Sequence, residues 1–338
     1  MTEYDTATMA GQRLMAGFDG TEFNDDIKYL IKDLKIGGLI LFSQNIKTPE
    51  QTKKLCTSAQ EFAMDQGLFP LFLAIDQEGG NVARLKKPYF TEFPGNPHIK
   101  GKKAVVDFAA ITAQELKRVR INMNLAPVLD FTAETENSIM KKRAFTGSPQ
   151  KIADLGITII KELQARGIMA CAKHFPGIGR TTLDSHLTLP QLDADKALLE
   201  KTDVIPFTAA KENAVAAIML SHILYTSIDS TWPASLSPAI ARKWLRDEMG
   251  YQGIVITDDL DMKAVKHDIK TCIHQILKSD IDIALICHKG PDIEKAFHFI
   301  NAGLNTDRHQ YEKGLISLER ILNVKNKYLN QIHINPVP

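Results

Sequence analysis

Short apolar runs recur along the chain, and stretches with apolar residues at three- and four-residue spacing lie between many of them. The short runs predict strands buried on both faces, and the longer stretches predict amphipathic helices. This alternation is typical of a parallel sheet covered by helices. The predicted strands lie near Leu14–Gly17, Gly38–Phe42, Leu71–Ile75, Ile121–Pro127, Ile168–Lys173, Ala216–Ser221, Ile254–Thr257 and Ile283–Cys287. The predicted helices include Pro49–Gln66, Ala104–Val119, Pro149–Arg166, Pro238–Met249 and Ala264–Lys278.

The number of strands decides between two α/β architectures. Eight strands with intervening helices fit a single (β/α)8 TIM-like barrel better than an open sheet, and 338 residues are enough for such a barrel. No serine- or proline-rich linker separates two halves of the chain. We therefore predict one domain over residues 1–338, with a carboxyl-terminal helix near Asp307–Leu329 lying across it.

Charge and composition mainly exclude partners. The chain has 41 lysine and arginine residues against 40 aspartate and glutamate residues, so the net charge of +1 favours neither a nucleic acid nor an anionic membrane. The amino-terminal segment has early acidic residues and no long apolar core, so we expect neither a signal peptide nor a transmembrane segment. The four cysteines are far apart, which suits reduced thiols better than disulfides or a zinc site. We expect a cytoplasmic monomer that acts on a small molecule.

Polar side chains follow several predicted strands at the point where each strand ends. Asp76 and Arg84 follow the third strand, and Asp130 follows the fourth. The carboxyl ends of barrel strands form the catalytic face, so we expect such side chains to converge there. Any one of them could be a cap or a structural ion pair, whereas the whole set indicates a site. The others are Lys173 and His174 after the fifth strand, Ser221 and His222 after the sixth, and Asp258, Asp259 and Asp261 after the seventh.

The loop after the fifth strand carries the most distinctive chemistry. It reads KHFPGIGRTTLDSHLTLP over residues 173–190, and its glycines and prolines interrupt regular structure. Asp184 and His186 are two positions apart, so an extended loop lets both side chains point the same way, with the carboxylate orienting the imidazole. Such a pair can act as a proton shuttle. The alternative is a capped turn with a solvated His186, and the short motif alone does not decide between them.

With these residues in view, the chain resembles the bacterial β-N-acetylglucosaminidases of glycoside hydrolase family 3, which are single-domain enzymes of peptidoglycan recycling. The loop over residues 173–190 is similar to the signature of the N-acetylglucosaminidase branch of that family. The other matching segments follow in order at similar spacing: GGLILF (37–42), AIDQEGGNVARL (74–85), LAPVLDF (125–131), KRAF (142–145), MLSHILYTSID (219–229) and PASLSPAIARKWLRDEMGYQGIVITDDLDM (233–262).

The resemblance implies a retaining exo-β-N-acetylglucosaminidase that removes terminal N-acetylglucosamine from anhydromuropeptides in peptidoglycan recycling. It makes Asp258 the nucleophile of a covalent glycosyl-aspartate intermediate, and His186 the general acid/base with Asp184 as its partner. It implies neither a metal nor a cofactor. The positions that hold the sugar in the family are matched by Asp76, Arg84, Arg143, Lys173 and His174.

These residue types suit that reaction on chemical grounds. A retaining glycosidase needs a carboxylate that stays ionised, and Lys173 or Arg84 near Asp258 would hold down the pKa of that aspartate. It also needs one group that first donates and later accepts a proton, and a histidine with an ordinary pKa of about 6.5 can do both. For His174 we expect a hydrogen bond to the sugar or to a backbone carbonyl rather than proton transfer.

The sequence departs from the family pattern in three places. Ile178 stands where the motif commonly has histidine, and Arg180 where a small or acidic residue is more usual. Asn81 replaces the arginine that often follows the double glycine, and residues 132–140 replace a segment rich in proline and asparagine. These departures bear on the leaving group and on the loop, and they leave the reaction type unchanged.

Three other functions stay open at this point. Arg180 adds a cation to the loop, so phosphate could replace water as the acceptor and make the protein a β-N-acetylglucosaminide phosphorylase. A catalytically silent sugar-binding barrel is the second, although the presence of both Asp258 and His186 argues against it. The third is a metal-dependent hydrolase, although such sites usually take two closely spaced histidines on an early strand, which this chain lacks. Its candidate ligands are His174, His186, His222, Asp258 and Asp259.

Overall fold

The computed structural model describes residues 4–133, 137–182, 189–262, 264 and 267–329. Eight parallel strands form the central sheet, in the order β11-β9-β7-β6-β3-β2-β1-β12. All eight predicted strands are present. Their bounds are β1 Leu14–Ala16, β2 Gly38–Leu41, β3 Phe72–Ile75, β6 Met123–Asn124, β7 Met169–Phe175, β9 Ala217–Leu220, β11 Ile254–Thr257 and β12 Ala284–Ile286.

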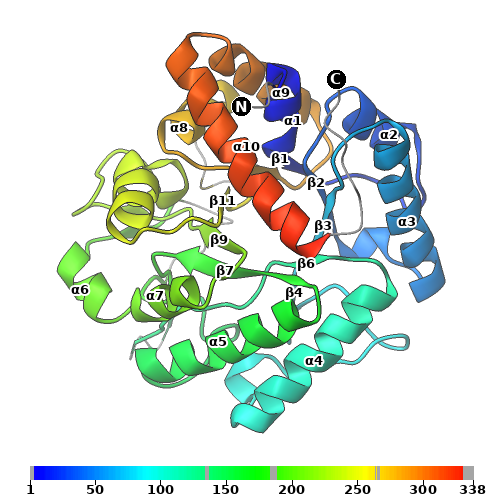
Figure 1. Ribbon diagram of the computed structural model, residues 1–338. Coiled ribbons are helices and arrows are strands. Elements are labelled where there is room, and N and C mark those ends of the chain that lie inside the picture. Colours follow the sequence, from blue (N-terminus) through cyan, green and yellow to red (C-terminus); the bar gives the residue numbers. More distant parts are fainter. Residues whose placement is uncertain (1–3, 134–136, 183–188, 263, 265–266, 330–338) are drawn as a thin grey trace.

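The sheet closes on itself. β1 pairs with β12 in parallel, and β12 is joined to β11 by a parallel bridge between Ile256 and Ile283. The backbone N–H of Thr257 donates to the carbonyl oxygen of Ile283 at 3.0 Å. Figure 1 shows the strands at the centre, with helices around them. The closure confirms the predicted (β/α)8 TIM-like barrel.

The fourth barrel strand is shorter than predicted. The prediction covered Ile121–Pro127, whereas β6 is limited to two residues, Met123–Asn124. The side-chain oxygens of Asn122 and Asn124 accept hydrogen bonds from the backbone N–H groups of Leu73 and Gln77 at 2.9 and 3.0 Å. The two asparagines therefore add side-chain bonds to the backbone pairing of β6 with β3.

Helices cover the outside of the barrel (Figure 1), and the five predicted ones are present with two differences. The segment Pro238–Glu248 is a π-helix rather than an α-helix. The helix predicted over Ala264–Lys278 begins at Ile269 instead, because the side chain of Asp268 caps it by accepting from the N–H of Thr271 at 2.7 Å. The helices are α1 Thr6–Gln12, α2 Asp25–Lys32, α3 Pro49–Asp65, α4 Lys102–Arg118, α5 Pro149–Ala165, α6 Lys196–Lys201, α7 Ile205–Glu212, η4 Pro238–Glu248, α8 Ile269–Lys278, α9 Pro291–Leu304 and α10 Arg308–Tyr328, with short 3-10 turns η1 Ser43–Asn45, η2 Asn96–His98 and η3 Ala234–Leu236.

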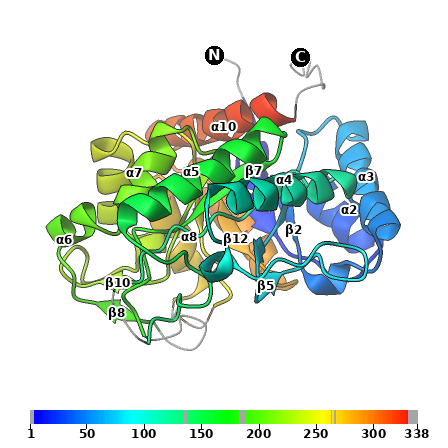
Figure 2. The ribbon, with the colours of Figure 1, turned by 90° about the horizontal axis from the view of Figure 1, so that it is seen from below.

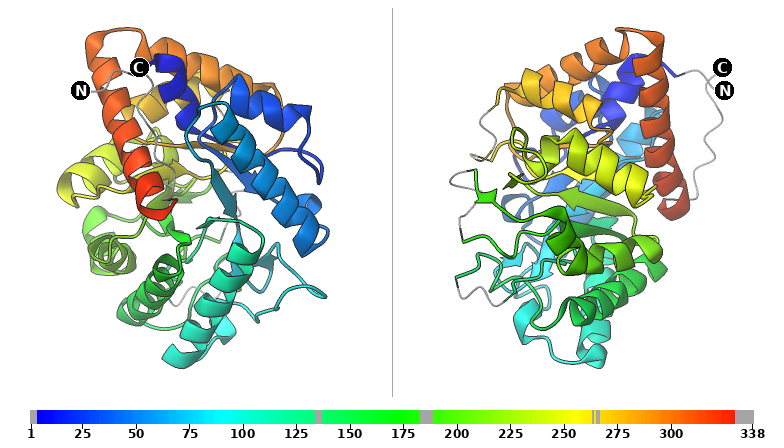
Figure 3. Two further views of the ribbon diagram at one scale, coloured as in Figure 1. Left: turned by 45° about the vertical axis from the view of Figure 1, so that its right-hand side comes forward. Right: turned by 90° about the vertical axis from the view of Figure 1, so that its left-hand side faces the viewer.

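The helix α10 covers the amino-terminal end of the barrel. It crosses the strands in Figure 1, and Figures 2 and 3 show it at the end opposite to the long loops that follow the strands (Figure 2, Figure 3). Its Lys325 is buried, and Nζ donates to Gln12 Oε1 at 2.6 Å and to Gly37 O at 2.9 Å. The same Nζ lies 4.7 Å from the centroid of the Phe72 ring. Burial lowers the pKa of Lys325 well below its ordinary value.

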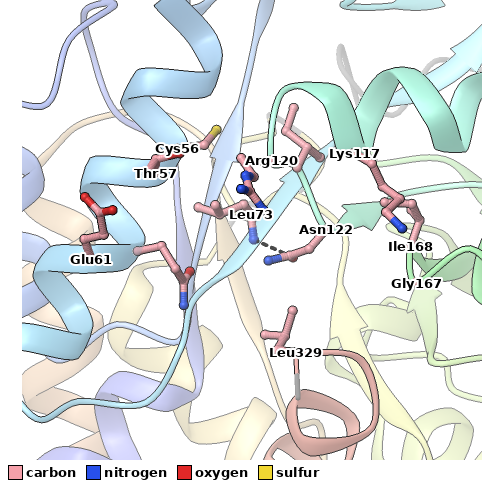
Figure 4. A pocket seen from close by; sticks show the side chains of 12 residues that line it. Cys56, Thr57, Glu61, Leu73, Lys117, Arg120, Asn122, Gly167, Ile168 and Leu329 are labelled. Carbon is pink, nitrogen blue, oxygen red and sulfur yellow. Dashed lines mark hydrogen bonds between the residues drawn. The ribbon is translucent and has the colours of Figure 1, made fainter. Parts of the chain in front are cut away.

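A cavity of about 390 Å³ lies beside this end of the barrel (Figure 4). Residues at the starts of strands line it together with residues of α3 and α4, and Leu329 closes one side just after α10. None of the predicted site residues that the structure describes lies in this cavity. Within the described part of the chain, we find no helix with both the length and the apolar character needed to cross a membrane.

Candidate active site

A second cavity, of about 540 Å³, lies at the carboxyl ends of the strands. Six of the eight residues predicted for the site line it, namely Asp76, Arg84, Arg143, Lys173, His174 and Asp258. The other two, Asp184 and His186, lie outside the described residues. Side chains from β2, β9 and β12, and Leu125 just after β6, complete the walls, so strands all around the barrel contribute to one site.

An ion cluster occupies one side of the cavity. Its central residue is Glu78, for which the sequence predicted no role. Lys173 Nζ lies 2.6 Å from Asp76 Oδ1 and 2.7 Å from Glu78 Oε1. Arg143 donates to both carboxylate oxygens of Glu78, from Nε at 2.9 Å and from Nη2 at 2.7 Å. Burial raises the pKa of Glu78, but the charges of Lys173 and Arg143 outweigh that effect and lower it to about 2. Arg84 Nη2 extends the cluster to Asp76 Oδ2 at 3.4 Å.

A short hairpin places the two carboxylates of this cluster. Asp76 and Glu78 are two positions apart at the end of β3 and in β4 (Gln77–Gly79), so their side chains point the same way. The turn to β5 (Val82–Ala83) runs through Gly80, whose φ of +58° favours glycine. A Cβ at Gly80 would also lie only 3.0 Å from the Cα atom of Gly95. The spacing of Asp76 and Glu78 was the signal that could have identified Glu78 from the sequence.

The fifth barrel strand presents two adjacent side chains to the cavity. β7 extends to Phe175, so Lys173 and His174 lie at the carboxyl end of the strand, as predicted. The peptide bond between them is cis, and both side chains line the cavity. His174 Nδ1 lies 2.8 Å from Asp130 Oδ2, and Nε2 lies 3.4 Å from Arg143 Nη2. The fully buried Asp130 is thus a second carboxylate without a role in the sequence prediction.

Asp258 follows β11 and is half-buried in the cavity wall. Burial raises its pKa, but the electrostatic influence of the neighbouring His222 and His174 outweighs this and lowers it below its ordinary value. The N–H of Asp259 also donates to Asp258 Oδ1 at 2.8 Å. The direction agrees with the sequence prediction. The cause differs, because Lys173 is the weakest of these influences.

A known protein family matches almost the whole chain in sequence. The sequence model of the family described as "Glycosyl hydrolase family 3 N terminal domain" matches residues 7–324. The chain belongs to this family. The match confirms the family that the sequence motifs indicate.

Known members of family 3 resemble the chain in sequence and in structure. It is 31% identical over 366 residues to "Beta-hexosaminidase A" of Pseudoalteromonas piscicida, covering 95% of this chain and 61% of that protein. It is 31% identical over 289 residues to a "Beta-hexosaminidase" of Pseudomonas aeruginosa, covering 84% of each. The structure of a family 3 β-N-acetylglucosaminidase from Paenibacillus sp. str. FPU-7 superposes with a TM-score of 0.93 at 32% identity, over 97% of this chain and 63% of that one. The chain therefore spans about three fifths of the length of two of these relatives.

The first part of the loop over residues 173–190, its stem at residues 177–180, is fixed by three contacts. Asp130 Oδ1 accepts from the N–H of Ile178 at 2.9 Å, and Tyr225 Oη donates to the carbonyl oxygen of Gly177 at 2.8 Å. Arg180 Nε donates to Asp203 Oδ2 at 2.8 Å. On the far side of the loop, β8 (Gln191–Leu192) pairs in parallel with β10 (Leu224–Tyr225). Both short strands lie at the same end of the barrel in Figure 2.

The two departures in this loop have different surroundings. Ile178 lines the cavity and gives it an apolar wall together with Ile139. Arg180 is absent from the cavity lining, and its Nη2 donates to Thr202 Oγ1 at 3.0 Å in addition to the bond with Asp203. The charge that the sequence analysis considered for phosphate is therefore paired with a buried carboxylate.

The candidate ligands of the metal-hydrolase alternative that the structure describes do not surround one common metal position. His222 Nδ1 bonds with Ser235 Oγ at 2.5 Å and Nε2 with the carbonyl oxygen of Asp259 at 2.7 Å, so both ring nitrogens are committed to protein groups. His174 Nδ1 is held by Asp130. Within the described ranges, the group whose donor atoms could surround one ion is a different one, Asp259, Asp261 and His288.

Proposed function

We propose that this family 3 protein is a retaining exo-β-N-acetylglucosaminidase that removes terminal N-acetylglucosamine through a covalent glycosyl-aspartate intermediate. The observation that carries the proposal is the position of Asp258, a carboxylate of lowered pKa in the same cavity as the Asp76–Lys173–Arg143 cluster. The printed names of the relatives, β-hexosaminidase and β-N-acetylglucosaminidase, support the same sugar and the same linkage.

Two displacements at the anomeric carbon make up the proposed reaction. The Asp258 carboxylate attacks C1, the bond from C1 to the leaving oxygen breaks, and His186 gives that oxygen its proton. Water then attacks C1 and passes a proton to His186, and the bond to Asp258 breaks. Asp184 stabilises the imidazolium that is present before the first step and again after the second. The roles of His186 and Asp184 rest on the family loop, and that of Asp258 rests on the family segment 233–262 together with the cavity.

The ion cluster supplies what an N-acetylated sugar needs to be held. Arg84, Arg143 and Lys173 offer charged donors to hydroxyl and carbonyl oxygens, while Asp76 accepts from hydroxyl groups. Because Asp76 and Glu78 already pair with these cations, the donors are oriented before the sugar arrives, which reduces the entropy lost on binding.

We further propose that water is the acceptor and that the natural substrate is an anhydromuropeptide in the cytoplasm. Hydrolysis is favoured over phosphorolysis because Arg180 is paired with Asp203 and does not line the cavity. A histidine as acid/base suits a leaving group that bears carboxylates, since a second glutamate would repel them.

Turnover of an aryl N-acetyl-β-glucosaminide, measured with and without phosphate, tests the proposal. The Asp258→Ala variant should lose several orders of magnitude in turnover, and azide or formate should restore part of it. Asp261→Asn is a matched control, because Asp261 is an exposed neighbour outside the cavity lining and its turnover should change little. Near-wild-type turnover by Asp258→Ala would place the nucleophile elsewhere. An inactive wild type would favour the silent sugar-binding barrel, and a strict need for phosphate would favour the phosphorylase.

A further inference from the structure

We infer that Asp130 is a positioning residue that fixes the proton of His174 on Nδ1 and so keeps Nε2 a hydrogen-bond acceptor in the sugar cavity. The inference rests on the proposed function for its kinetic consequence. It concerns a residue that does not line the cavity itself and acts on the sugar through His174.

The first step concerns the proton on Nδ1. Asp130 lies just after β6, where Val128 forms a parallel bridge with Lys173, so its segment runs beside the end of β7. Its side chain is fully buried, and Oδ2 lies 2.8 Å from His174 Nδ1. A carboxylate that is ionised can only accept, so the proton of this bond sits on Nδ1. Oδ1 accepts from the backbone N–H of His174 at 3.3 Å, which fixes the carboxylate against the same residue.

The second step concerns the opposite ring nitrogen. Arg143 Nη2 lies 3.4 Å from His174 Nε2, and a guanidinium can only donate. Nε2 is therefore the acceptor, and the two neighbours together select one neutral tautomer. Arg143 cannot easily turn away to admit a proton on Nε2, because Glu78 holds it through two hydrogen bonds.

The third step is the consequence for the sugar. The cations around the cavity, Arg84, Arg143 and Lys173, are donors, so a sugar hydroxyl that must donate needs an acceptor. Asp76 is one such acceptor, and His174 Nε2 is a second, where a sugar hydroxyl would share or replace the long 3.4 Å contact with Arg143. Without Asp130 the ring could carry its proton on Nε2, and the site would then present one more donor in place of an acceptor. The same Asp130 Oδ1 also accepts from Ile178, so one carboxylate sets both the ring and the loop stem.

The Asp130→Asn variant tests this reasoning, because the amide has the shape of the carboxylate and keeps one acceptor oxygen. Its amide nitrogen would donate to Nδ1 and force the ring proton onto Nε2, where it meets the Arg143 donor. We expect KM to rise by about ten- to hundredfold, with kcat changing much less. In a His174→Ala background the same substitution should change KM by less than about threefold, since the ring through which it acts is gone.

A matched control separates positioning from a loosened loop. Asp203 is also a buried carboxylate, it holds the loop stem through Arg180, and no hydrogen bond joins it to His174 among the described residues. The effect of Asp203→Asn should be the same with and without His174→Ala. If Asp130→Asn also had the same effect in both backgrounds, Asp130 would be a structural residue only and the inference would be wrong.

The ring tautomer can be read without relying on any variant of Asp130. Nitrogen NMR of ¹⁵N-histidine-labelled wild type, with the His174 signals identified by their loss in His174→Gln, should show a protonated Nδ1 and an unprotonated Nε2 at neutral pH. A proton on Nε2 in the free protein would overturn the inference. This spectrum is independent of turnover, so a protein inactive on N-acetylglucosaminides would refute the proposed function and still report on Asp130.

Discussion

Glu78 illustrates at the scale of a single residue how one buried carboxylate orders two cations. Its side chain is 1% exposed, and it bonds to both Lys173 and Arg143. Neither partner could be assigned from the sequence, because Arg143 lies 65 positions away along the chain. The pairing of Asp130 with His174 spans 44 positions and was missed for the same reason. The strand pattern predicts that polar residues lie at the carboxyl-terminal face of the barrel. Which of these residues contact one another depends on how the barrel packs.

The Glu78→Gln variant should be strongly destabilised at neutral pH, by about 3–5 kcal/mol, because it leaves the buried Lys173 and the half-buried Arg143 without their shared partner. The folded-state pKa of about 2 lies below the ordinary value of 4.5, so the charge of Glu78 stabilises the fold fully above about pH 4.5 and progressively less as the pH falls toward 2. Urea unfolding between pH 5 and pH 2.5 should therefore show a steeper loss for the wild type than for the variant. Equal slopes would contradict the shifted pKa. Glu312→Gln, which removes an exposed pair with Arg308, is the control and should change little.

The loop histidine supplies a second prediction at this scale. His186→Ala should slow substrates with poor leaving groups far more than activated aryl glycosides, because the poor leaving groups need a proton as the bond breaks. Turnover of a disaccharide and of a 4-nitrophenyl glycoside by the same variant measures this difference. Equal losses on both substrates would remove His186 from the acid/base role.

At the scale of elements, the sequence predicted strands better than it predicted their ends. Apolar runs such as Gly38–Leu41 are buried on both faces, and that requirement is visible locally in the sequence. The ends are less visible in the sequence: β6 is limited to Met123–Asn124, whereas the apolar run predicted a strand as far as Pro127. For α10, the amphipathic pattern predicted the helix, whereas the lysine that it buries against the barrel had no local signal.

The Lys325→Met variant tests how α10 covers the barrel. The folded-state pKa of Lys325 lies well below its ordinary value of 10.5, so the unfolded chain takes up a proton that the folded protein resists, and the wild type loses stability as the pH falls below about 10.5. Methionine cannot titrate, so the variant should gain stability relative to the wild type between pH 10.5 and pH 8. Urea unfolding at both pH values measures this, with Lys327→Met, an exposed position on the same helix, as the control. A difference that does not change with pH would mean that Lys325 stays charged in the fold.

At the scale of the whole molecule, the barrel converts sequence order into one site. Asp76 and Asp258 are separated by most of the chain, yet both line the cavity because parallel barrel strands end at one face. This rule made five of the eight site residues predictable as a group, and the family resemblance added Arg143. Their pairing, and the paired state of Arg180, required the three-dimensional arrangement, since Asp203 lies 23 positions further along the chain.

The most direct test of the account is the configuration of the first product. Displacement by Asp258 followed by displacement by water returns the β configuration of the substrate, whereas a single attack by water gives the α anomer. Proton NMR during the first turnovers of an N-acetyl-β-glucosaminide should show the β anomer first, followed by slow mutarotation, and exhaustive chelation should not alter this result. An α anomer as the first product, or activity lost to the chelator and restored by zinc, would contradict the covalent mechanism at Asp258.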